Sequence, residues 1–285
     1  MKDTSETTCL LTLILNNSKM NCSQKEIQWN QWLAGIIDGD GYLAIQKNKV
    51  AVCEITMPLT DEYLLAQIKQ KLGGHIRLRS GAKAVRYRLT HQVGIQELIH
   101  RVNGQIFNSQ RIPQLQALCN KFNIQFLPAK QLSQTSAYTA GFFDADGTIY
   151  MAVGSTFCRE YTTQKGILGK INRLAHSRGA NQVKISISNK YLQNLLRFQQ
   201  AFQLGKIREV KQKAKTWHVW EITNEHEILL FLDYVRKYPL RSSKAKRFFL
   251  LERYFELKQM KAHLSPPATQ LNKAWFLFAQ KWYLG

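Results

Sequence analysis

The sequence WLAGIIDGDG occupies residues 32–41, and a close copy, YTAGFFDADG, occupies residues 138–147. Each copy joins a small and apolar helical stretch directly to Asp-x-Asp-Gly. The small residues around Gly35 and Gly141 would let two helix backbones approach closely, while the bulky residues after them would face two separate cores. The two copies therefore predict a pair of matched helices that pack together, each ending in acidic residues.

The composition indicates a folded protein with a polyanionic partner. The chain of 285 residues has 40 Lys and Arg against 19 Asp and Glu, a net charge of +21, and 45% hydrophobic residues. Its length favours one or two domains, and its charge favours a nucleic acid or an anionic membrane surface. No apolar run approaches the roughly 18 residues that span a bilayer, so we expect no membrane partner. Five scattered cysteines without a C-x-x-C pair argue against a disulfide framework or a structural zinc site.

The acids of the two motifs indicate a function rather than a simple connection. A carboxylate at a helix C-terminus is unfavourable unless a cation compensates for it. Paired carboxylates in a strongly basic protein therefore suggest divalent metal ions held against phosphates, which is nuclease chemistry. An EF-hand calcium loop is excluded, because its fifth position needs Asp or Asn and holds Tyr42 or Thr148. We expect Gly39, Gly41 and Gly147 to supply the positive φ of a helix C-terminus.

The two motifs begin two copies of one larger unit. Helix-like and strand-like stretches follow the order α-β-β-α-β-β-α-α in the first copy, and the second copy repeats them. LGGHIR at residues 72–77, for example, is echoed by QLGKIR at residues 203–208. We expect the additional residues of the second copy to form a loop at 155–180. The predicted parts are a poorly ordered leader (1–28, not a signal peptide), a first half (29–126), a linker (127–135), a second half (136–262) and a tail helix (263–285).

The two motifs resemble those of the LAGLIDADG homing endonucleases. LAGIIDGDG at residues 33–41 matches the name sequence at seven of nine positions, and the looser second copy keeps DADG at residues 144–147. The element order fits this family over about residues 30–260. The resemblance implies an α+β fold with a duplicated αββαββα unit, in a monomer with pseudo-twofold symmetry. It also implies that two saddle-shaped antiparallel sheets lie in the DNA major groove.

The resemblance assigns roles to residues at matching positions. Asp40 and Asp146 match the acids that bind metal, whereas Asp38 and Asp144 match the structural acids before them. Gly35 and Gly141 match the small residues of the helix contact. Lys244 matches a basic residue near the scissile phosphate, and the internal repeat puts Arg111 at that place in the first half.

One position differs between the two halves. Asn189 matches a polar residue that positions the attacking water, but its first-half counterpart is Met57, which cannot form a useful hydrogen bond. The nearby Glu54 is the candidate substitute. This difference predicts two half-sites of unequal efficiency.

The mechanism implied by the resemblance is metal-assisted hydrolysis of one phosphodiester in each DNA strand. Two or three Mg²⁺ ions are implied, and Mn²⁺ or Ca²⁺ would replace them for binding. The product would be a staggered double-strand break at a long asymmetric target.

Side chains on one face of each predicted sheet would read the DNA sequence, because a β-surface fits the major groove and alternate residues share a face. The basic stretches at residues 206–215 and 236–247 would hold the DNA backbone. The candidates for DNA contact are Gln46, Glu54, Arg77, Arg79, Arg86, Arg88, Lys184, Ser186, Arg208, Trp217 and Glu221.

Two other functions fit the same fold. One is a maturase that binds intron RNA to assist splicing, with or without DNA cleavage. The other is a DNA-binding regulator without catalysis, although loss of one acid would be expected there and both acids are present. By resemblance, we expect a mitochondrial or chloroplast location.

Overall fold

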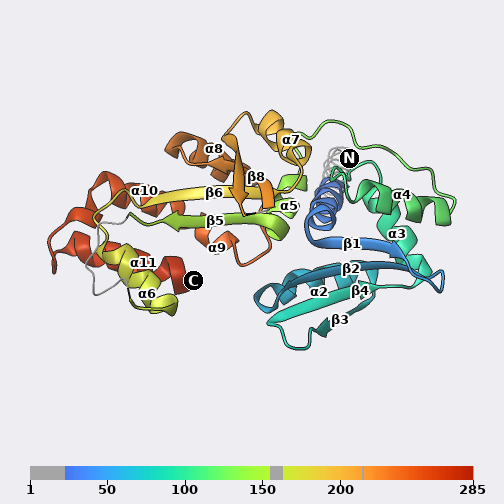
Figure 1. Cartoon of the computed structure of the whole chain (residues 1–285), viewed down its shortest axis with the longest axis horizontal. Helices are drawn as coiled ribbons and strands as arrows, with labels where there is room; N and C mark the ends of the chain where they lie inside the picture. Colours follow the sequence, from blue (N-terminus) through green and yellow to red (C-terminus); the bar gives the residue numbers. More distant parts are fainter. Residues whose placement is uncertain (1–22, 155–162, 214, 285) are drawn as a thin grey trace, which may run out of the picture. The chain divides into compact units, whose positions relative to one another are not determined.

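The structure, a computed structural model, describes residues 23–154, 163–213 and 215–284, which form two compact units (Figure 1). The first unit takes in residues up to Met57 together with Leu65–Lys130 and Thr135–Phe142. The second takes in Pro58–Leu64, Gln131–Gln134 and the chain from Phe143 onward. Most of the predicted leader lies outside the described residues, but residues 23–28 are helical and so belong to the first motif helix.

The first half contains the elements that the sequence predicts. In chain order they are a helix over residues 23–40, β1 (Gly41–Ile45), β2 (Ala51–Pro58), the 3-10 turn η1 (Leu59–Asp61), α2 (Glu62–Leu72), β3 (His75–Leu78), β4 (Ala84–Leu89), α3 (Gln92–Val102) and α4 (Ile112–Lys121). The strands form one sheet in the order β1-β2-β4-β3.

The second half repeats this order and adds to it. Its elements are α5 (Tyr138–Asp146), β5 (Gly147–Ala152), α6 (Gly166–His176), β6 (Gln182–Asn189), α7 (Leu192–Phe202), β7 (Lys206–Gln212), β8 (Lys215–Ile222), α8 (Glu225–Lys237), α9 (Ala245–Phe248), α10 (Leu251–Gln259), the 3-10 turn η3 (Ala262–Leu264) and α11 (Gln270–Leu284). The sheet order, β5-β6-β8-β7, is that of the first half. The predicted tail helix is present as α11.

The prediction of a loop at residues 155–180 is wrong for the second part of this segment. Residues 155–162 lie outside the described residues, but Gly166–His176 form α6. Ile171, Leu174 and Ala175 make its buried side, and α6 packs against α11 (Figure 1). The glycines and basic residues of this segment concealed an amphipathic helix.

The strands follow the alternation of their sequences. In β4, Val85, Tyr87 and Leu89 are buried, whereas the side chains between them, Arg86 and Arg88, lie on the other face. This period of two separates a face packed against helices from a polar face. Each sheet therefore has one core face and one face that carries charged residues.

Glycines at the motif helix ends serve close approach rather than positive φ. Gly39, Gly41 and Gly147 do not have positive φ. The prediction that they supply the positive φ of a helix C-terminus is therefore wrong. A Cβ at Gly41 would lie 2.6 Å from the carbonyl oxygen of Ile37, and one at Gly147 would overlap the Phe143 ring. The chain therefore needs glycine where each helix turns sharply into a strand.

The two motif helices contact each other through their glycines. A Cβ at Gly35 would overlap the carbonyl oxygen of Tyr138, and one at Gly141 would overlap that of Trp32. Both contacts lie in the first unit. The predicted close approach of the two backbones is thus present.

The second unit has an aromatic core beyond its sheet. Phe231 lies 5.4 Å from Phe202, 5.9 Å from Trp220 and 5.9 Å from Phe143, measured between ring centroids. This cluster joins α5, α7, α8 and β8.

No helix within the described ranges is both long and apolar enough to cross a membrane.

Candidate active site

Arg111 holds the end of the first motif helix. Its Nε donates to the carbonyl oxygen of Ile37 at 3.2 Å, and its Nη2 donates to that of Gly39 at 3.4 Å. The last carbonyls of a helix lack partners within the helix and carry the negative end of its dipole, so a guanidinium there is favourable. These bonds use two of the three nitrogens of the guanidinium. Asp40, the last residue of this helix, is half-buried beside them.

Lys244 does the same for α5 with a more complete set of bonds. Its Nζ donates to the carbonyl oxygens of Phe143, Asp144 and Ala145 at 3.0, 2.8 and 2.7 Å. An ammonium group has three protons, so these bonds occupy all of them. Lys244 would therefore reach a phosphate only by exchanging one of these carbonyls for it. Asp146, which ends α5, is exposed.

Asp38 holds the loop that leads to Arg111. Its Oδ2 accepts hydrogen bonds from the backbone N–H groups of Phe107 and Asn108 at 2.6 and 3.0 Å, and from the hydroxyl of Tyr138 at 2.5 Å. The side chain is fully buried, and burial raises its pKa to about 6, although these hydrogen bonds oppose the rise. Asp38 is thus placed to support the loop rather than to face solvent.

Asp144 has the equivalent arrangement in the second half. Its Oδ2 accepts from the backbone N–H of Arg241 at 2.9 Å, and its Oδ1 accepts from the N–H and hydroxyl of Ser242 at 2.9 and 2.6 Å. In each half, the first acid of Asp-x-Asp-Gly fixes a loop two to four residues before the basic residue. The contacts agree with the structural role expected of Asp38 and Asp144.

The acids that could hold metal stand at the ends of the two helices. Within the described ranges, no cluster of three or more His, Cys, Asp or Glu side chains forms a ready metal cage. Asp40 and Asp146 each provide one carboxylate. Mg²⁺ commonly binds through one or two carboxylates together with water and substrate phosphates, so such a sparse donor set fits Mg²⁺ better than a cage metal.

The sheet registers confirm that Met57 and Asn189 occupy equivalent positions. Gly41 pairs with Ile55, and Gly147 pairs with Ile187, so the two positions lie two residues further along β2 and β6. Met57 is buried with 2% of its surface exposed. Asn189 is half-buried, and its Oδ1 accepts from the backbone N–H of Tyr191 and from Nδ2 of Asn194. The two halves therefore differ in polarity at this position.

Asp61 is a site residue that the sequence did not reveal. It ends η1, which belongs to the second unit. Its side chain is 6% exposed, and Oδ1 accepts from the backbone N–H of Ser243 at 2.7 Å. Nothing local in the sequence links Asp61 to a loop 182 residues away.

A carboxylate binds two arginines on the polar face of the first sheet. Glu54 on β2 lies 3.4 Å from Nη1 of Arg86 and 3.4 Å from Nε of Arg88, both on β4. Arg77 on β3 pairs with Arg86 in the register. Arg79 follows β3, and these four arginines share a cavity of about 260 Å³. Candidates from three strands are thus brought together.

The second sheet has a similar cluster, in which one glutamate again lies between two basic side chains. Glu221 on β8 lies 3.3 Å from Lys184 on β6 and 3.6 Å from Arg208 on β7, and it accepts a hydrogen bond from the Tyr150 hydroxyl at 3.1 Å. Ser186, directly opposite Glu221, is only 6% exposed. Its neighbours cover it, so Ser186 is a poor candidate for contact with a base.

The remaining DNA-contact candidates lie apart from these clusters. Gln46 is exposed just after β1, where the chain turns towards β2. Trp217 is half-buried on β8, opposite Val210 of β7.

A family model described as "LAGLIDADG endonuclease" matches residues 33–124 and 139–255, which contain both motifs. The chain belongs to this family. Membership agrees with the duplicated unit and the two four-stranded antiparallel sheets, so the predicted fold class is confirmed.

Two curated relatives of this LAGLIDADG chain bear different functional names. "Intron-encoded RNA maturase bI4" of Saccharomyces cerevisiae is 39% identical over 98% of this chain and 43% of its own length. "Intron-encoded DNA endonuclease ai2b" of Dictyostelium discoideum is 31% identical over 88% of both chains. The chain thus spans less than half the length of the yeast relative.

Solved LAGLIDADG-type structures share the fold. I-SmaMI, whose structure is described as bound to uncleaved DNA target in the presence of calcium ions, aligns with a TM-score of 0.59 over 87% of this chain and 97% of its own. The two sequences are 15% identical, so this likeness concerns the fold alone.

Proposed function

We propose that this protein is a site-specific double-stranded DNA homing endonuclease that acts as a monomer. The observation that carries the proposal is the pair of motif helices, which contact each other through Gly35 and Gly141 and end in Asp40 and Asp146. Two equivalent acids in one chain suit the cutting of two strands. The names of the Dictyostelium relative and of the I-SmaMI structure support DNA as the substrate.

In this proposal, Asp40 and Asp146 would hold divalent metal ions, with Mg²⁺ as the expected ion. Bound metal would supply Lewis-acid stabilisation of the charge that develops on the scissile phosphate. The calcium ions named for I-SmaMI support the use of divalent ions.

The protein's own groups would position the phosphates. Asp38 and Asp144 fix the loops before Arg111 and Lys244, so these two cations stay beside the helix ends. Arg111 would donate to a phosphate oxygen from its remaining N–H groups, and Lys244 by exchanging one carbonyl. Asn189 would orient a water in one half-site through its amide. Met57 cannot do so in the other, and Glu54 is held by two arginines.

The test is selection of cleaved duplexes from a randomised DNA library in the presence of Mg²⁺. We expect the wild type to yield a long asymmetric target, and Asp40→Asn and Asp146→Asn each to lose double-strand cleavage. Folding of both variants is verified by circular dichroism. Cleavage that survives in both variants would show that these acids are not the metal ligands, and a library that stays uncut would refute the nuclease function.

A second candidate function is that of an intron RNA maturase. The name of the yeast relative, which is 39% identical, favours it specifically. The two functions can occur together, and the intron-encoded relatives support the organellar origin expected from the sequence. The direct test adds the purified protein to an intron that does not splice by itself and measures whether the intron is then spliced.

A further inference from the structure

The second half contains helices that the first half lacks. α6 lies between β5 and β6, and α11 follows the last helix of the repeated unit. In the described part of the first half, β1 leads directly to β2 through a short turn. Since the first half forms its sheet and loops without them, the α6 and α11 additions are not required by the repeated unit.

The segments that contain α6 and α11 carry basic residues but no acidic ones. Residues 163–181 and 257–284 contain no Asp or Glu, although the whole chain has about one acid for every two basic residues. Such a one-signed surface repels itself and favours a polyanionic partner. The basic residues of these two stretches are Lys165, Lys170, Arg173, Arg178, Lys258, Lys261, Lys273 and Lys281.

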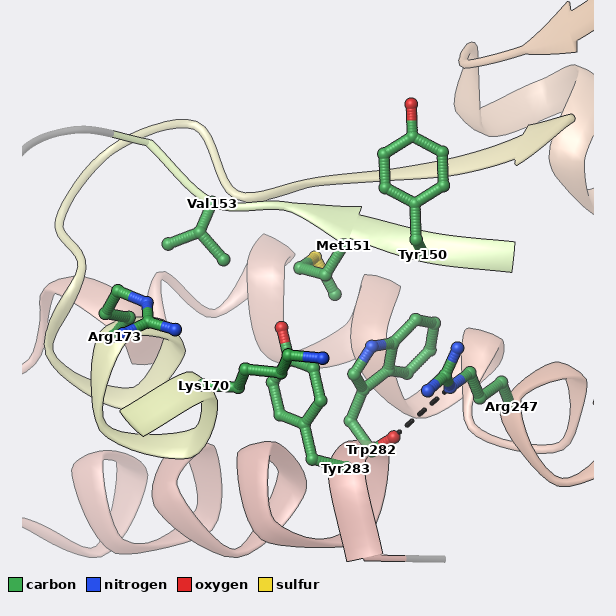
Figure 2. A pocket seen from close by; sticks show the side chains of 8 residues that line it. All are labelled: Tyr150, Met151, Val153, Lys170, Arg173, Arg247, Trp282 and Tyr283. Carbon is green, nitrogen blue, oxygen red and sulfur yellow. Dashed lines mark hydrogen bonds between the residues drawn. The ribbon is translucent and has the colours of Figure 1, made fainter. Parts of the chain in front are cut away.

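A cavity of about 310 Å³ lies where α6, α9, α11 and the edge strand β5 meet (Figure 2). Lys170 and Arg173 reach it from α6, Arg247 from α9, and Trp282 and Tyr283 from α11. We call it the α6–α11 cavity. Its volume is at the lower end for ligand pockets, which suits one nucleotide unit rather than a duplex.

The cavity is arranged in advance to receive an anion. Arg247 is fixed, because its Nη1 donates to the carbonyl oxygen of Ile149 at 2.8 Å and its guanidinium lies 5.7 Å from the Trp282 ring centroid. Burial raises the pKa of Tyr283, while Arg247 and Arg173 both oppose that rise. Both guanidinium groups and the exposed Lys170 line the same cavity as Tyr283.

The α6–α11 cavity lies on the core side of its sheet, away from the proposed DNA-contact face. Met151 of β5 points towards the cavity, whereas the neighbouring Tyr150 points away from it (Figure 2), and the Tyr150 hydroxyl bonds to Glu221. Successive residues of a strand face opposite sides of a sheet. A duplex lying against Glu221, Lys184 and Arg208 would leave this cavity open.

We propose that the α6–α11 cavity binds a phosphate of a second nucleic-acid strand, separate from the duplex on the sheet face. The proposal rests on the proposed function only in assigning a duplex to that face. Phosphodiesters of RNA and of single-stranded DNA share the recognised chemistry. The phosphate would take hydrogen bonds from Lys170, Arg247 and the Tyr283 hydroxyl.

The test measures binding of fluorescein-labelled oligouridylate to the full chain that is already saturated with unlabelled duplex DNA. We expect the labelled strand to bind without displacing the duplex. Lys170→Glu should weaken this binding and lower the slope of log K against log salt by about 0.7, the share of one phosphate contact. Tyr283→Phe, which keeps the ring, should weaken binding without changing the slope.

Matched variants and probes make the test decisive. Lys69→Glu reverses another exposed charge, on α2, to which no binding role is assigned, and should leave strand binding unchanged. Oligothymidylate in place of oligouridylate distinguishes DNA from RNA as the source of the phosphate. The proposal is overturned if duplex DNA displaces the labelled strand, or if Lys170→Glu and Lys69→Glu bind it equally. DNA cleavage by Lys170→Glu, assayed separately, tests the nuclease function independently.

Discussion

The ionisation of Asp38 makes the stability of the folded protein depend on pH. Its pKa in the folded protein, about 6, lies above its ordinary value of 3.8 because the side chain is buried. Folding therefore favours the protonated form. The stabilisation is complete below pH 3.8 and is lost as the pH rises through about 6.

We expect Asp38→Asn to remove this pH dependence. The amide oxygen can accept the same hydrogen bonds from Phe107, Asn108 and Tyr138, but no buried charge remains. The free energy of unfolding of the wild type should therefore fall relative to the variant by up to about 3 kcal/mol between acid and neutral pH. Urea titrations of both proteins across this range measure it, and a difference that does not vary with pH would contradict the burial effect.

At the scale of elements, the contact between the motif helices depends on two glycines. A methyl group at Gly35 or Gly141 would overlap a backbone carbonyl of the other helix, which cannot move aside as a side chain could. We expect Gly35→Ala and Gly141→Ala each to cost about 3 kcal/mol of folding free energy or more. Chemical denaturation followed by tryptophan fluorescence measures the loss.

Gly81→Ala is the matched control for this contact. Gly81 lies in the β3–β4 turn with a φ of +71°, and no atom lies within 4 Å of its added Cβ. The control should cost only about 1–2 kcal/mol, the strain of a left-handed residue. Equal losses for the three variants would mean that helix contact is not the dominant cost.

The turn η1 is a second element with a specific consequence. Asp61 accepts from the Ser243 N–H, in the loop that leads to Lys244. We expect Asp61→Ala to increase hydrogen exchange at the Ser243 amide and to cost about 1 kcal/mol locally, because the part-buried Ser243 N–H loses its acceptor. Asp61→Asn keeps an acceptor and should retain protection. Glu62→Ala, which alters the adjacent exposed acid, should change nothing; protection retained in Asp61→Ala would contradict the assignment.

For the whole molecule, the net charge of +21 predicts steep salt dependence. If six to ten phosphates are contacted, duplex affinity should fall about 10³- to 10⁵-fold between about 50 and 200 mM salt. Fluorescence anisotropy with a random-sequence duplex measures this fall. Sucrose at matched osmolarity should leave the affinity unchanged, and a weak salt dependence would mean that few of the 40 basic residues meet DNA.

Much of the whole fold could be predicted because its signals are local. The alternation of Val85, Arg86, Tyr87 and Arg88 separates two faces within a few residues, and the repeat showed the order of helices and strands along the chain twice. The α6 helix was missed because glycines and basic residues hide its apolar side. The site was predicted only in part: motif spacing indicates Asp40 and Asp146, but no local signal shows that Lys244 gives all three of its protons to carbonyls. Those bonds depend on a fold that brings distant segments together.

The helix α5 is divided between the two units, with Tyr138–Phe142 in the first and Phe143–Asp146 in the second. This has a consequence for protein engineering. In a chimaera that joins the halves of two relatives at the linker, Gly141 would come from one parent and Trp32 from the other. The two helices that meet at this contact would then not be matched to each other. A crossover placed after Phe142 keeps the helix contact with the first parent and the Asp144 loop with the second. The better junction for recombination therefore lies inside a helix rather than in the loop that connects the halves.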